Sequence, residues 1–298
     1  MSPVLPTPSL AASEQLPAAT ILHLSDLHFQ DRRQAAQWFD QLAEDLQFEL
    51  KLKELDVVVL SGDITDRSRA RGYEAAQQFL ADLQQEYRLS PEQFVLVPGN
   101  HDVSRDVSLD AYDRRPRGER PDNVPDGEVI DEEGAEILIR NTERYRQRFA
   151  AFAAFYRSVR PDTYPLAEEQ QFSLQFFPGK RLLILGLNSA WETDHHYQDR
   201  AGINNVALGF ALRQVRTTAA YQDCLKVAVW HHPVQSAGDD RIRDTGFLER
   251  LAKAGFRVGL HGHIHEAQPG LFRSDMSYAG RRIELLGAGT FGAAGVER

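Results

Sequence analysis

The 298-residue chain has one cysteine, Cys224, so it has neither an internal disulfide nor a cysteine pair for a zinc knuckle. No apolar run approaches the roughly 18 residues that a membrane-spanning helix needs. Positive charge is not in excess either. The formal net charge is −9, whereas non-specific nucleic-acid binding relies on a basic surface. These absences predict a soluble cytoplasmic protein with no membrane partner, and they disfavour, without excluding, a nucleic-acid partner.

The beginning of the chain lacks the basic start and the sustained apolar core of a secretory signal. Residues 1–19 are rich in proline, serine and alanine, and we expect a disordered leader there. With 42% hydrophobic residues, the remainder is long enough to bury a large core. We expect residues 20–298 to form a single domain with a charged insert and helix at about 104–160.

Apolar runs alternate with amphipathic segments in the first hundred residues. Strands are predicted at 21–29 (ILHLSDLHF), 56–60 and 94–97, with helices at 32–55 and 73–87 between them. This alternation is typical of parallel strands with helices packed outside. If the first strand stays extended beyond its apolar part, its terminal Asp-Leu-His should project a carboxylate and an imidazole together.

The pattern changes after residue 104. Residues 104–136 are rich in charge, proline and glycine, which predicts a mobile surface excursion, and residues 135–160 have helical spacing. The insert is either a lid over a site or a peripheral helix with an irregular approach. For the second half, the expected elements are a hairpin of 172–176 with 182–187, helices at 204–219 and 245–254, strands at 225–230 and 257–260, and an antiparallel pair of 271–278 with 282–286.

Polar clusters follow five of the predicted strands. They are Asp26-x-His28, Gly62-Asp63, Gly99-Asn100-His101-Asp102, His231-His232-Pro233 and Gly262-His263-x-His265. Alone, any one of them is better explained by hydrogen-bonded surface residues. Together they offer imidazole, carboxylate and amide oxygen without thiolate, a donor set that suits Mn, Fe, Zn or Ni. Two such ions about 3.5–4 Å apart can share a hydroxide and bind a phosphoryl oxygen.

The order and spacing of the five clusters resemble the calcineurin-like metallophosphoesterase superfamily, over roughly residues 20–290. The resemblance implies an α/β fold, a four-layer α/β/β/α sandwich of two mixed sheets flanked by helices, with two divalent metal ions (Mn, Fe or Zn) between the sheets. It assigns the ligands as follows: Asp26, His28 and His265 at one metal, Asn100, His231 and His263 at the other, and Asp63 bridging both.

The same resemblance implies roles outside the metal ligands. It places His101 beside the leaving-group oxygen, and we expect Asp102 to orient it; alternatively, His101 only binds a ligand carboxylate. In the polar loop after residue 188, His195 and His196 are within reach of a substrate, and we take His196 as the candidate contact. Asp66 is expected to fix the loop that follows Asp63.

The His-Asp pair after Asn100 and the full ligand set resemble most the branch of class III cyclic-nucleotide phosphodiesterases and glycerophosphodiesterases. We therefore expect a phosphodiesterase that acts on a small phosphodiester such as a cyclic nucleotide, with a metal-bridging hydroxide as nucleophile. Alternatives are a DNA nuclease, a phosphomonoesterase or pyrophosphatase, and a non-catalytic scaffold on the same fold. The nuclease alternative needs a basic groove, for which only Arg114–Arg120 and Arg140–Arg148 are candidates, and both are mixed with acids. The oligomeric state stays open.

Overall fold

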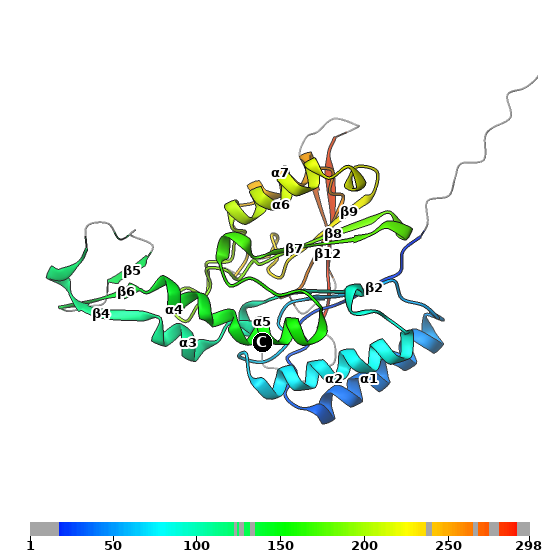
Figure 1. Ribbon diagram of the computed structural model, residues 1–298, viewed down its shortest axis with the longest axis horizontal. Coiled ribbons are helices and arrows are strands. Elements are labelled where there is room, and N and C mark those ends of the chain that lie inside the picture. Colours follow the sequence, from blue (N-terminus) through cyan, green and yellow to red (C-terminus); the bar gives the residue numbers. More distant parts are fainter. Residues whose placement is uncertain are drawn as a thin grey trace, which may run out of the picture.

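A computed structural model describes residues 18–121, 124, 128–131, 135–236, 240–264, 268–273 and 280–290. Two β-sheets lie face to face, with helices on both outer sides (Figure 1). The smaller sheet is parallel throughout, in the order β1-β2-β3. Its strands are β1 (Ile21–Leu24), β2 (Val57–Ser61) and β3 (Phe94–Val97).

The larger sheet is mixed and has the order β11-β12-β10-β9-β8-β7. Its strands are β7 (Phe172–Phe177), β8 (Leu182–Leu187), β9 (Leu225–Val229), β10 (Val258–His261), β11 (Gln268–Arg273) and β12 (Arg282–Gly287). The four central strands are parallel, whereas β7 and β11 pair with their neighbours in the antiparallel sense. The predicted hairpin of β7 with β8 and the predicted strand at β3 are confirmed.

Alternation along each central strand divides the core into layers. In β2, Val57 and Val59 face the larger sheet, whereas Val58 and Leu60 pack against helices. In β8, Ile184 likewise packs between the sheets, while its neighbours belong to the core under the opposite helices. Strands buried on both faces explain why the runs are continuously apolar rather than alternating. The expected four-layer sandwich is thus confirmed, except that the smaller sheet, in its described strands, is parallel and not mixed.

The helices cover the two outer faces. The smaller sheet is covered by α1 (Arg32–Glu44), α2 (Ala70–Tyr87) and α5 (Ala150–Val159), and the larger sheet by α6 (Asn205–Thr217) and α7 (Gly246–Lys253). A π-helical turn, Asp45–Glu49, extends α1. The first helix is shorter than the predicted 32–55, because Lys51 adopts a left-handed conformation (φ 54°) that ends it. No helix among the described residues is both long and apolar enough to span a bilayer.

The insert is more regular than its composition predicts. It begins with α3 (Arg105–Asp110) and forms an antiparallel sheet in the order β4-β6-β5, from β4 (Tyr112–Pro116), β5 (Val129–Asp131) and β6 (Glu136–Arg140); α4 (Thr142–Arg146) follows. This sheet extends away from the sandwich (Figure 1). The prediction of a helix that begins at 135 is therefore wrong at its start, because the apolar run at 137–139 forms a buried strand and the helical part of this segment begins only at Thr142.

Short 3₁₀ turns occupy several connections. They are Pro91–Gln93, Asn100–Asp102, Arg117–Glu119, Gln147–Phe149, Glu168–Gln170, Pro178–Lys180 and Ala219–Tyr221. The turn at Asn100–Asp102 matters for the site, because it directly follows β3 and redirects three adjacent side chains within three residues. The carboxyl ends of parallel strands meet at one edge of a sheet. All five polar clusters begin at such ends.

Candidate metal centre

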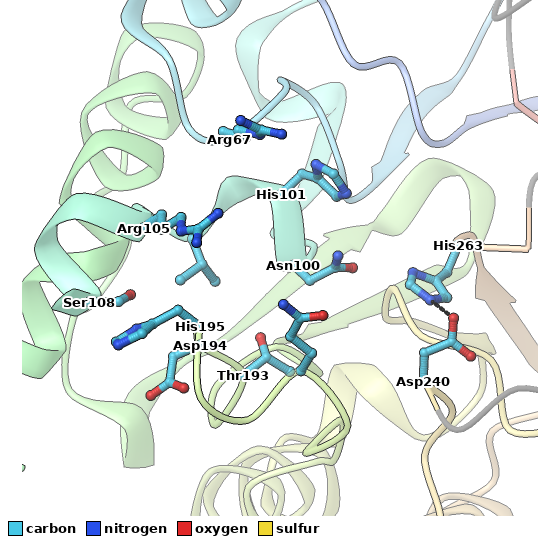
Figure 2. Close-up of a pocket in the computed structure, with 12 residues that line it drawn as sticks. Arg67, Asn100, His101, Arg105, Ser108, Thr193, Asp194, His195, Asp240 and His263 are labelled. Atoms are coloured by element: carbon cyan, nitrogen blue, oxygen red, sulfur yellow. Dashed lines mark hydrogen bonds and ion pairs between the residues drawn. The ribbon is translucent and has the colours of Figure 1, made fainter. Parts of the chain in front are cut away.

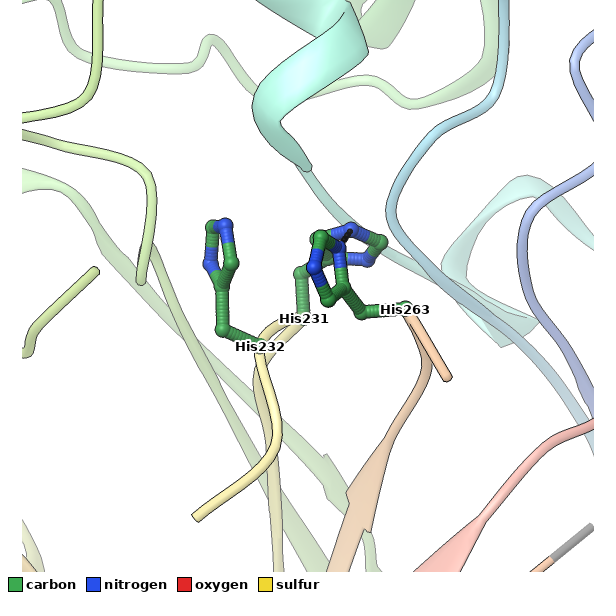
Figure 3. A group of neighbouring side chains, drawn as sticks. All are labelled: His231, His232 and His263. Atoms are coloured by element: carbon green, nitrogen blue, oxygen red, sulfur yellow. Dashed lines mark hydrogen bonds between the residues drawn. The ribbon is translucent and has the colours of Figure 1, made fainter. Parts of the chain in front are cut away.

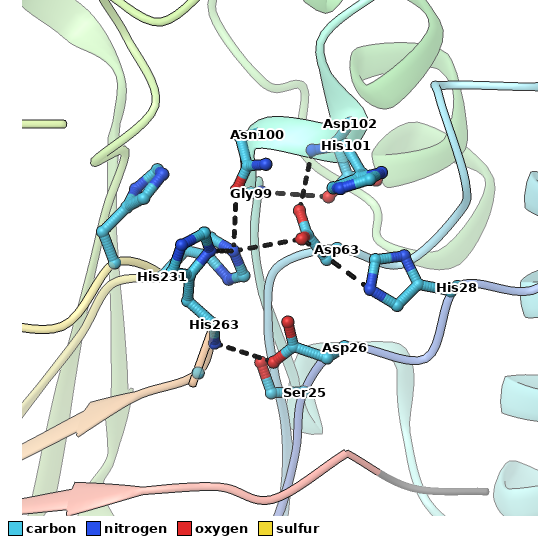
Figure 4. A network of polar contacts seen from close by, with 12 residues as sticks. Ser25, Asp26, His28, Asp63, Gly99, Asn100, His101, Asp102, His231 and His263 are labelled. Carbon is cyan, nitrogen blue, oxygen red and sulfur yellow. Dashed lines mark hydrogen bonds and ion pairs between the residues drawn. The ribbon is translucent and has the colours of Figure 1, made fainter. Parts of the chain in front are cut away.

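Side chains from five strand ends meet between the two sheets (Figure 4). They are Asp26 and His28 after β1, Asp63 after β2, Asn100 after β3, His231 after β9 and His263 after β10. Ligand atoms lie within 4.8 Å of one another in three groups: Asp26 with Asp63 and His231, His28 with Asp63 and His101, and His231 with His232 and His263. His265 lies outside the described residues.

Asp26 and His28 reach the centre by a route that differs from the predicted one. β1 ends at Leu24, and both residues adopt the left-handed region, with φ of 54° and 45°. The expectation of a continuing extended strand is therefore wrong. The loop is held instead by backbone hydrogen bonds from the two residues' N–H groups to the carbonyls of Gly62 (3.1 Å) and Asp63 (3.0 Å). Such backbone strain costs about 1–3 kcal/mol per residue and is concentrated at functional sites.

Asp63 lies at the middle of the cluster and is 1% exposed. Its Oδ2 is 3.3 Å from Nε2 of His231 and 3.9 Å from Nε2 of His28, while its Oδ1 accepts a hydrogen bond from the backbone of His101 (2.8 Å). Burial raises the pKa of Asp63, but the charges of His231, His101 and His28 outweigh burial and hold it well below the usual value. The carboxylate is thus held ionised between two groups of imidazoles.

The ring of His231 is oriented by a backbone carbonyl. Its Nδ1 donates to the carbonyl of Ser61 (2.8 Å), which directs Nε2 toward Oδ1 of Asn100 and Nδ1 of His263, both 3.2 Å away. Burial lowers the pKa of His231, yet Asp63 more than compensates and raises it to about 9. Nε2 therefore faces three other potential ligand atoms at once.

Carboxylates contact both the backbone and the ring of His263. Its backbone N–H donates to Oδ2 of Asp26 (2.8 Å), and its Nε2 contacts Oδ2 of Asp240 (2.7 Å). The remaining ring nitrogen, Nδ1, therefore points toward His231 (Figure 3). This carboxylate–histidine arrangement is typical of imidazoles that bind metals.

Ser189 positions the two histidines that follow β9. Its Oγ accepts hydrogen bonds from the backbone N–H groups of His231 (3.1 Å) and His232 (3.0 Å) and lies 2.9 Å from Nδ1 of His232. Because Oγ already accepts two bonds, its own proton goes to Nδ1. Burial, followed by the neighbouring His231 and His263, lowers the pKa of His232 well below the usual value. His232 is thus a neutral ring fixed beside the centre.

Replacement of Ser189 with alanine is expected to lower stability by about 1–3 kcal/mol, because buried donors lose their acceptor. Metal affinity should fall by roughly 10–100-fold, the usual effect of removing a group that orients ligands. Calorimetric metal titration and thermal unfolding measure both. Ser173→Ala, at a half-buried serine of β7, is the matched control. Unchanged metal affinity in the Ser189 variant would contradict the positioning role.

Three glycines pack directly against the candidate ligands. A Cβ added at Gly62 would lie 2.5 Å from Nδ1 of His231, one at Gly99 would lie 2.2 Å from Oδ1 of Asp63, and one at Gly262 would lie 2.6 Å from Oδ2 of Asp26. No side chain fits at these positions. The backbone therefore forms a close cradle around a set of imidazole, carboxylate and amide donors. Such a set fits divalent cations of the Mn, Fe or Zn kind.

Two further histidines, His23 in β1 and His261 in β10, belong to the packing around the centre. Nε2 of His23 contacts Oγ of Ser61 (2.8 Å), and burial, with a smaller effect of His261, lowers the pKa of His23 to about 3. The ring of His261 is stacked on Trp230, with centroids 6.3 Å apart. Both rings support neighbouring strands.

His101 and Asp102 both lie in the 3₁₀ turn, which directs their side chains to different sides. The ring of His101 lies against His28, with centroids 4.7 Å apart, and its Nδ1 contacts Oδ1 of Asp66 (3.3 Å). Asp102 instead points inward, where it is fully buried and accepts hydrogen bonds from the N–H of Gly99 (2.9 Å) and from the backbone after Asp63. The expectation that Asp102 orients His101 is thus wrong, and Asp66 occupies that position.

Asp102 has a structural part in the centre. Besides the backbone groups, it accepts a hydrogen bond from the hydroxyl of Tyr73 (3.1 Å). Burial, together with the negative charge of Asp63, raises its pKa to about 6. It ties the loop after β3 to the loop after β2. This is a buried link between two ligand-bearing segments.

A cavity of about 370 Å³ opens beside the cluster (Figure 2). Candidate ligands Asn100 and His263 line it together with His101. Of the two loop histidines, His195 lines the cavity, whereas the exposed ring of His196 packs against Tyr112 (centroids 5.0 Å apart). Sequence reasoning also missed the remaining lining side chains: Arg67, Val103, Arg105, Ser108, Thr193, Asp194, Gln198 and Asp240. Their only sequence signal is proximity to the polar clusters and to the insert.

Several arginines of the two basic patches are engaged in ion pairs. Arg114 contacts Glu136, Arg140 contacts Glu128, and Arg144 contacts Asp113. Arg148 is completely buried. These contacts favour the interpretation of a structured, charge-paired insert over that of a basic groove.

Comparison with known proteins agrees with this geometry. The family model described as Calcineurin-like phosphoesterase matches residues 19–267. The chain belongs to this family. Membership indicates a metal-dependent phosphoesterase and confirms the superfamily and the fold class expected from the five clusters.

Two individual proteins are similar to the chain. One is an uncharacterized metallophosphoesterase-like protein, YydB, of Bacillus subtilis (strain 168), 24% identical over 258 residues that cover 83% of this chain and 48% of that protein. The chain thus spans about half the length of this curated relative. The other is the crystal structure of phosphopantetheinyl hydrolase (PptH) from Mycobacterium tuberculosis, with 15% identity, a TM-score of 0.37 and coverage of 92% of this chain and 91% of that one.

Proposed function

We propose that the protein is a binuclear metal-dependent hydrolase of phosphate esters, and specifically a phosphodiesterase that acts on a small phosphodiester such as a cyclic nucleotide. The observation that supports this most is the meeting of donors from five strand ends around Asp63, next to an open cavity. The cavity is within the size range of small-molecule sites, roughly 300–1,000 Å³. The alternatives are a nuclease, a monoesterase and a pyrophosphatase.

In this proposal the ligands divide into two groups. Asp26, His28 and His265 would hold one ion, Asn100, His231 and His263 would hold the other, and Asp63 would be shared by both. When bound, two divalent ions supply Lewis-acid activation of water and of a phosphoryl oxygen. The buried, ionised carboxylate of Asp63 offsets part of their mutual repulsion.

A side chain of the protein protonates the leaving group. Water attacks phosphorus and loses a proton, the bond from phosphorus to the leaving oxygen breaks, and the leaving oxygen gains a proton. His101 faces the cavity and is the group positioned to give this proton, with Asp66 at 3.3 Å to orient the ring.

Replacement of His101 with alanine should lower turnover by on the order of 10²–10⁴-fold, because a positioned acid is lost. Both metals should stay bound, since the backbone N–H that contacts Asp63 remains. Steady-state kinetics and elemental analysis of the same samples measure the two quantities. Asp66→Asn should have a smaller effect in the same direction. Loss of an ion from the His101 variant would make this residue structural.

The proposed activity is tested with protein stripped of metal and reloaded with manganese. The substrates are 3′,5′-cyclic nucleotides, aryl phosphodiesters, phosphomonoesters, pyrophosphates and DNA. We expect metal-dependent hydrolysis with the highest kcat/KM on a small phosphodiester. Preference for monoesters, pyrophosphates or DNA would replace the diesterase proposal by the corresponding alternative, and inactivity on all of them would refute a phosphoesterase.

A further inference from the structure

The cavity has a second wall that faces the metal-side residues. Arg105 and Ser108 come from α3 of the insert, and His195 comes from the loop after β8. In Figure 2 these three lie together on one side, while Asn100 and His263 lie on the other. A substrate whose phosphodiester is bound at the metal side therefore extends toward this wall.

Arg105 brings an uncompensated charge to the wall. Its side chain is exposed, and among the described residues no hydrogen-bond or ion-pair partner contacts its guanidinium. The two carboxylates that line the cavity are already engaged. Asp194 accepts from the hydroxyl of Tyr112 (2.5 Å) and from the backbone of residues 196 and 197, while Asp240 contacts His263. Among the residues that the structure describes, the cavity thus contains a guanidinium that is not neutralised by an ion pair.

His195 adds a buried ring nitrogen without a hydrogen-bond partner among the described residues. Its Nδ1 is buried, and no hydrogen-bond partner for it occurs in the part of the chain that the structure describes. Burial lowers the pKa of His195, and His196 and Arg105 lower it further against the opposing effect of Asp194. The imidazole is therefore neutral at pH 7 and electrostatically coupled to Arg105. A buried polar atom without a partner costs about 1–3 kcal/mol, which a ligand oxygen would recover.

The backbone that carries the wall is held by contacts between the insert and the loop that bears His195. The buried guanidinium of Arg148 lies 3.5 Å above the ring of Tyr145 and donates to the carbonyls of Tyr145 (2.8 Å) and Trp191. The hydroxyl of Tyr145 in turn donates to the carbonyl of Glu192 (3.3 Å). The insert and the loop that bears His195 are thereby joined at several points. The backbone therefore needs little ordering when a ligand binds, and the exposed side chain of Arg105 is the part that a ligand would order.

We propose that Arg105 and His195 form a second anion subsite, and that the substrate of this enzyme is a phosphodiester that carries a further phosphate group. The inference rests on the proposed function and refines it. A guanidinium binds phosphate through two parallel hydrogen bonds, and the oxygens of the same group reach the imidazole. A simple cyclic nucleotide has no second phosphate and leaves this subsite unused. The described lining residues also include no phenylalanine, tyrosine or tryptophan on which a base could stack.

The test uses two chromogenic diesters that differ by one phosphate: thymidine 5′-(4-nitrophenyl phosphate) and its 3′-phosphorylated counterpart. With manganese-loaded protein, we expect kcat/KM to favour the 3′-phosphorylated ester by roughly 10–100-fold, as one charged hydrogen-bonding contact provides. The preference should arise in KM. In Arg105→Met the ratio of the two kcat/KM values should fall toward one, and Arg105→Lys should keep part of it. Arg33→Met, at an exposed arginine of α1, is the matched control and should keep the full ratio.

The outcomes separate the inference from the proposed function. Equal kcat/KM for both esters in the wild-type protein overturns the second subsite while the phosphodiesterase stands. An equal loss on both esters in Arg105→Met, with the ratio retained, also overturns it, because Arg105 then acts elsewhere. If neither ester is hydrolysed at any manganese concentration, the proposed function fails and the inference fails with it. Circular dichroism of each variant confirms folding.

Discussion

Asp63→Asn is expected to reduce phosphodiester hydrolysis by on the order of 10²–10⁴-fold. The change keeps the shape of the side chain but removes the one charge that His28, His101 and His231 share. Metal-ion catalysis supplies several kcal/mol of transition-state stabilisation, and each 1.36 kcal/mol of it that is lost slows the reaction about tenfold. Metal content should fall in parallel, as measured by elemental analysis after gel filtration.

The matched control is Asp40→Asn, which removes a carboxylate from an exposed position of α1 and should change neither quantity. If the Asp63→Asn protein is folded, has wild-type activity and binds two ions, the carboxylate of Asp63 is not part of the metal centre. The comparison also separates specific loss from a general effect of lowering the negative charge by one unit.

Gly99→Ala is expected to lower stability, metal affinity and activity together. The new Cβ would lie 2.2 Å from Oδ1 and 2.5 Å from the backbone nitrogen of Asp63. Gly99 has an ordinary φ of −107°, so the cause is the contact and not backbone conformation. Overpacking of this kind costs about 1–3 kcal/mol, and the displaced carboxylate should lower metal affinity and activity at least tenfold. Thermal unfolding and manganese titration are the measurements.

Gly179→Ala is the control for this steric argument. A Cβ there has no neighbour within 4 Å, and the residue lies in the surface turn Pro178–Lys180. The control should unfold at nearly the wild-type temperature. If Gly99→Ala binds manganese as tightly as the control does, close approach of the backbone is not what positions Asp63.

The sandwich could be predicted because each of its central strands is marked by a short apolar run in the sequence. The runs at β2, β3 and β8 are continuously apolar, and such runs form strands that are buried on both faces wherever they pair. The polar residues after them mark the strand ends directly. Parallel strands bring the ends within one sheet to one edge, whereas the meeting of clusters from both sheets was implied by the family resemblance.

The local backbone around Asp26 could not be predicted in the same way. Its left-handed conformation depends on hydrogen bonds to carbonyls of the loop after β2, which is more than thirty residues away. The prediction that Asp102 orients His101 failed for a related reason. Adjacency in sequence suggested Asp102 as its partner, but a 3₁₀ turn directs Asp102 toward the hydroxyl of Tyr73 and the backbone.

The insert shows how charge can conceal a strand. β4 is mostly charged, and it is held in part by an ion pair from Arg114 to Glu136 of β6. Only the short apolar stretch at 137–139 marks the sheet in the sequence. The cavity wall that contains Arg105 and His195 arises from packing of this insert on a loop some ninety residues later, so no local pattern encodes it.

The most direct test is a crystal structure of the protein grown with manganese, with the ions located by anomalous scattering. The account predicts two peaks roughly 3.5–4 Å apart on either side of Asp63, one near Asp26 and His28 and the other near Asn100, His231 and His263. Manganese bound elsewhere, or a folded protein that takes up no ion at saturating concentration, would contradict it.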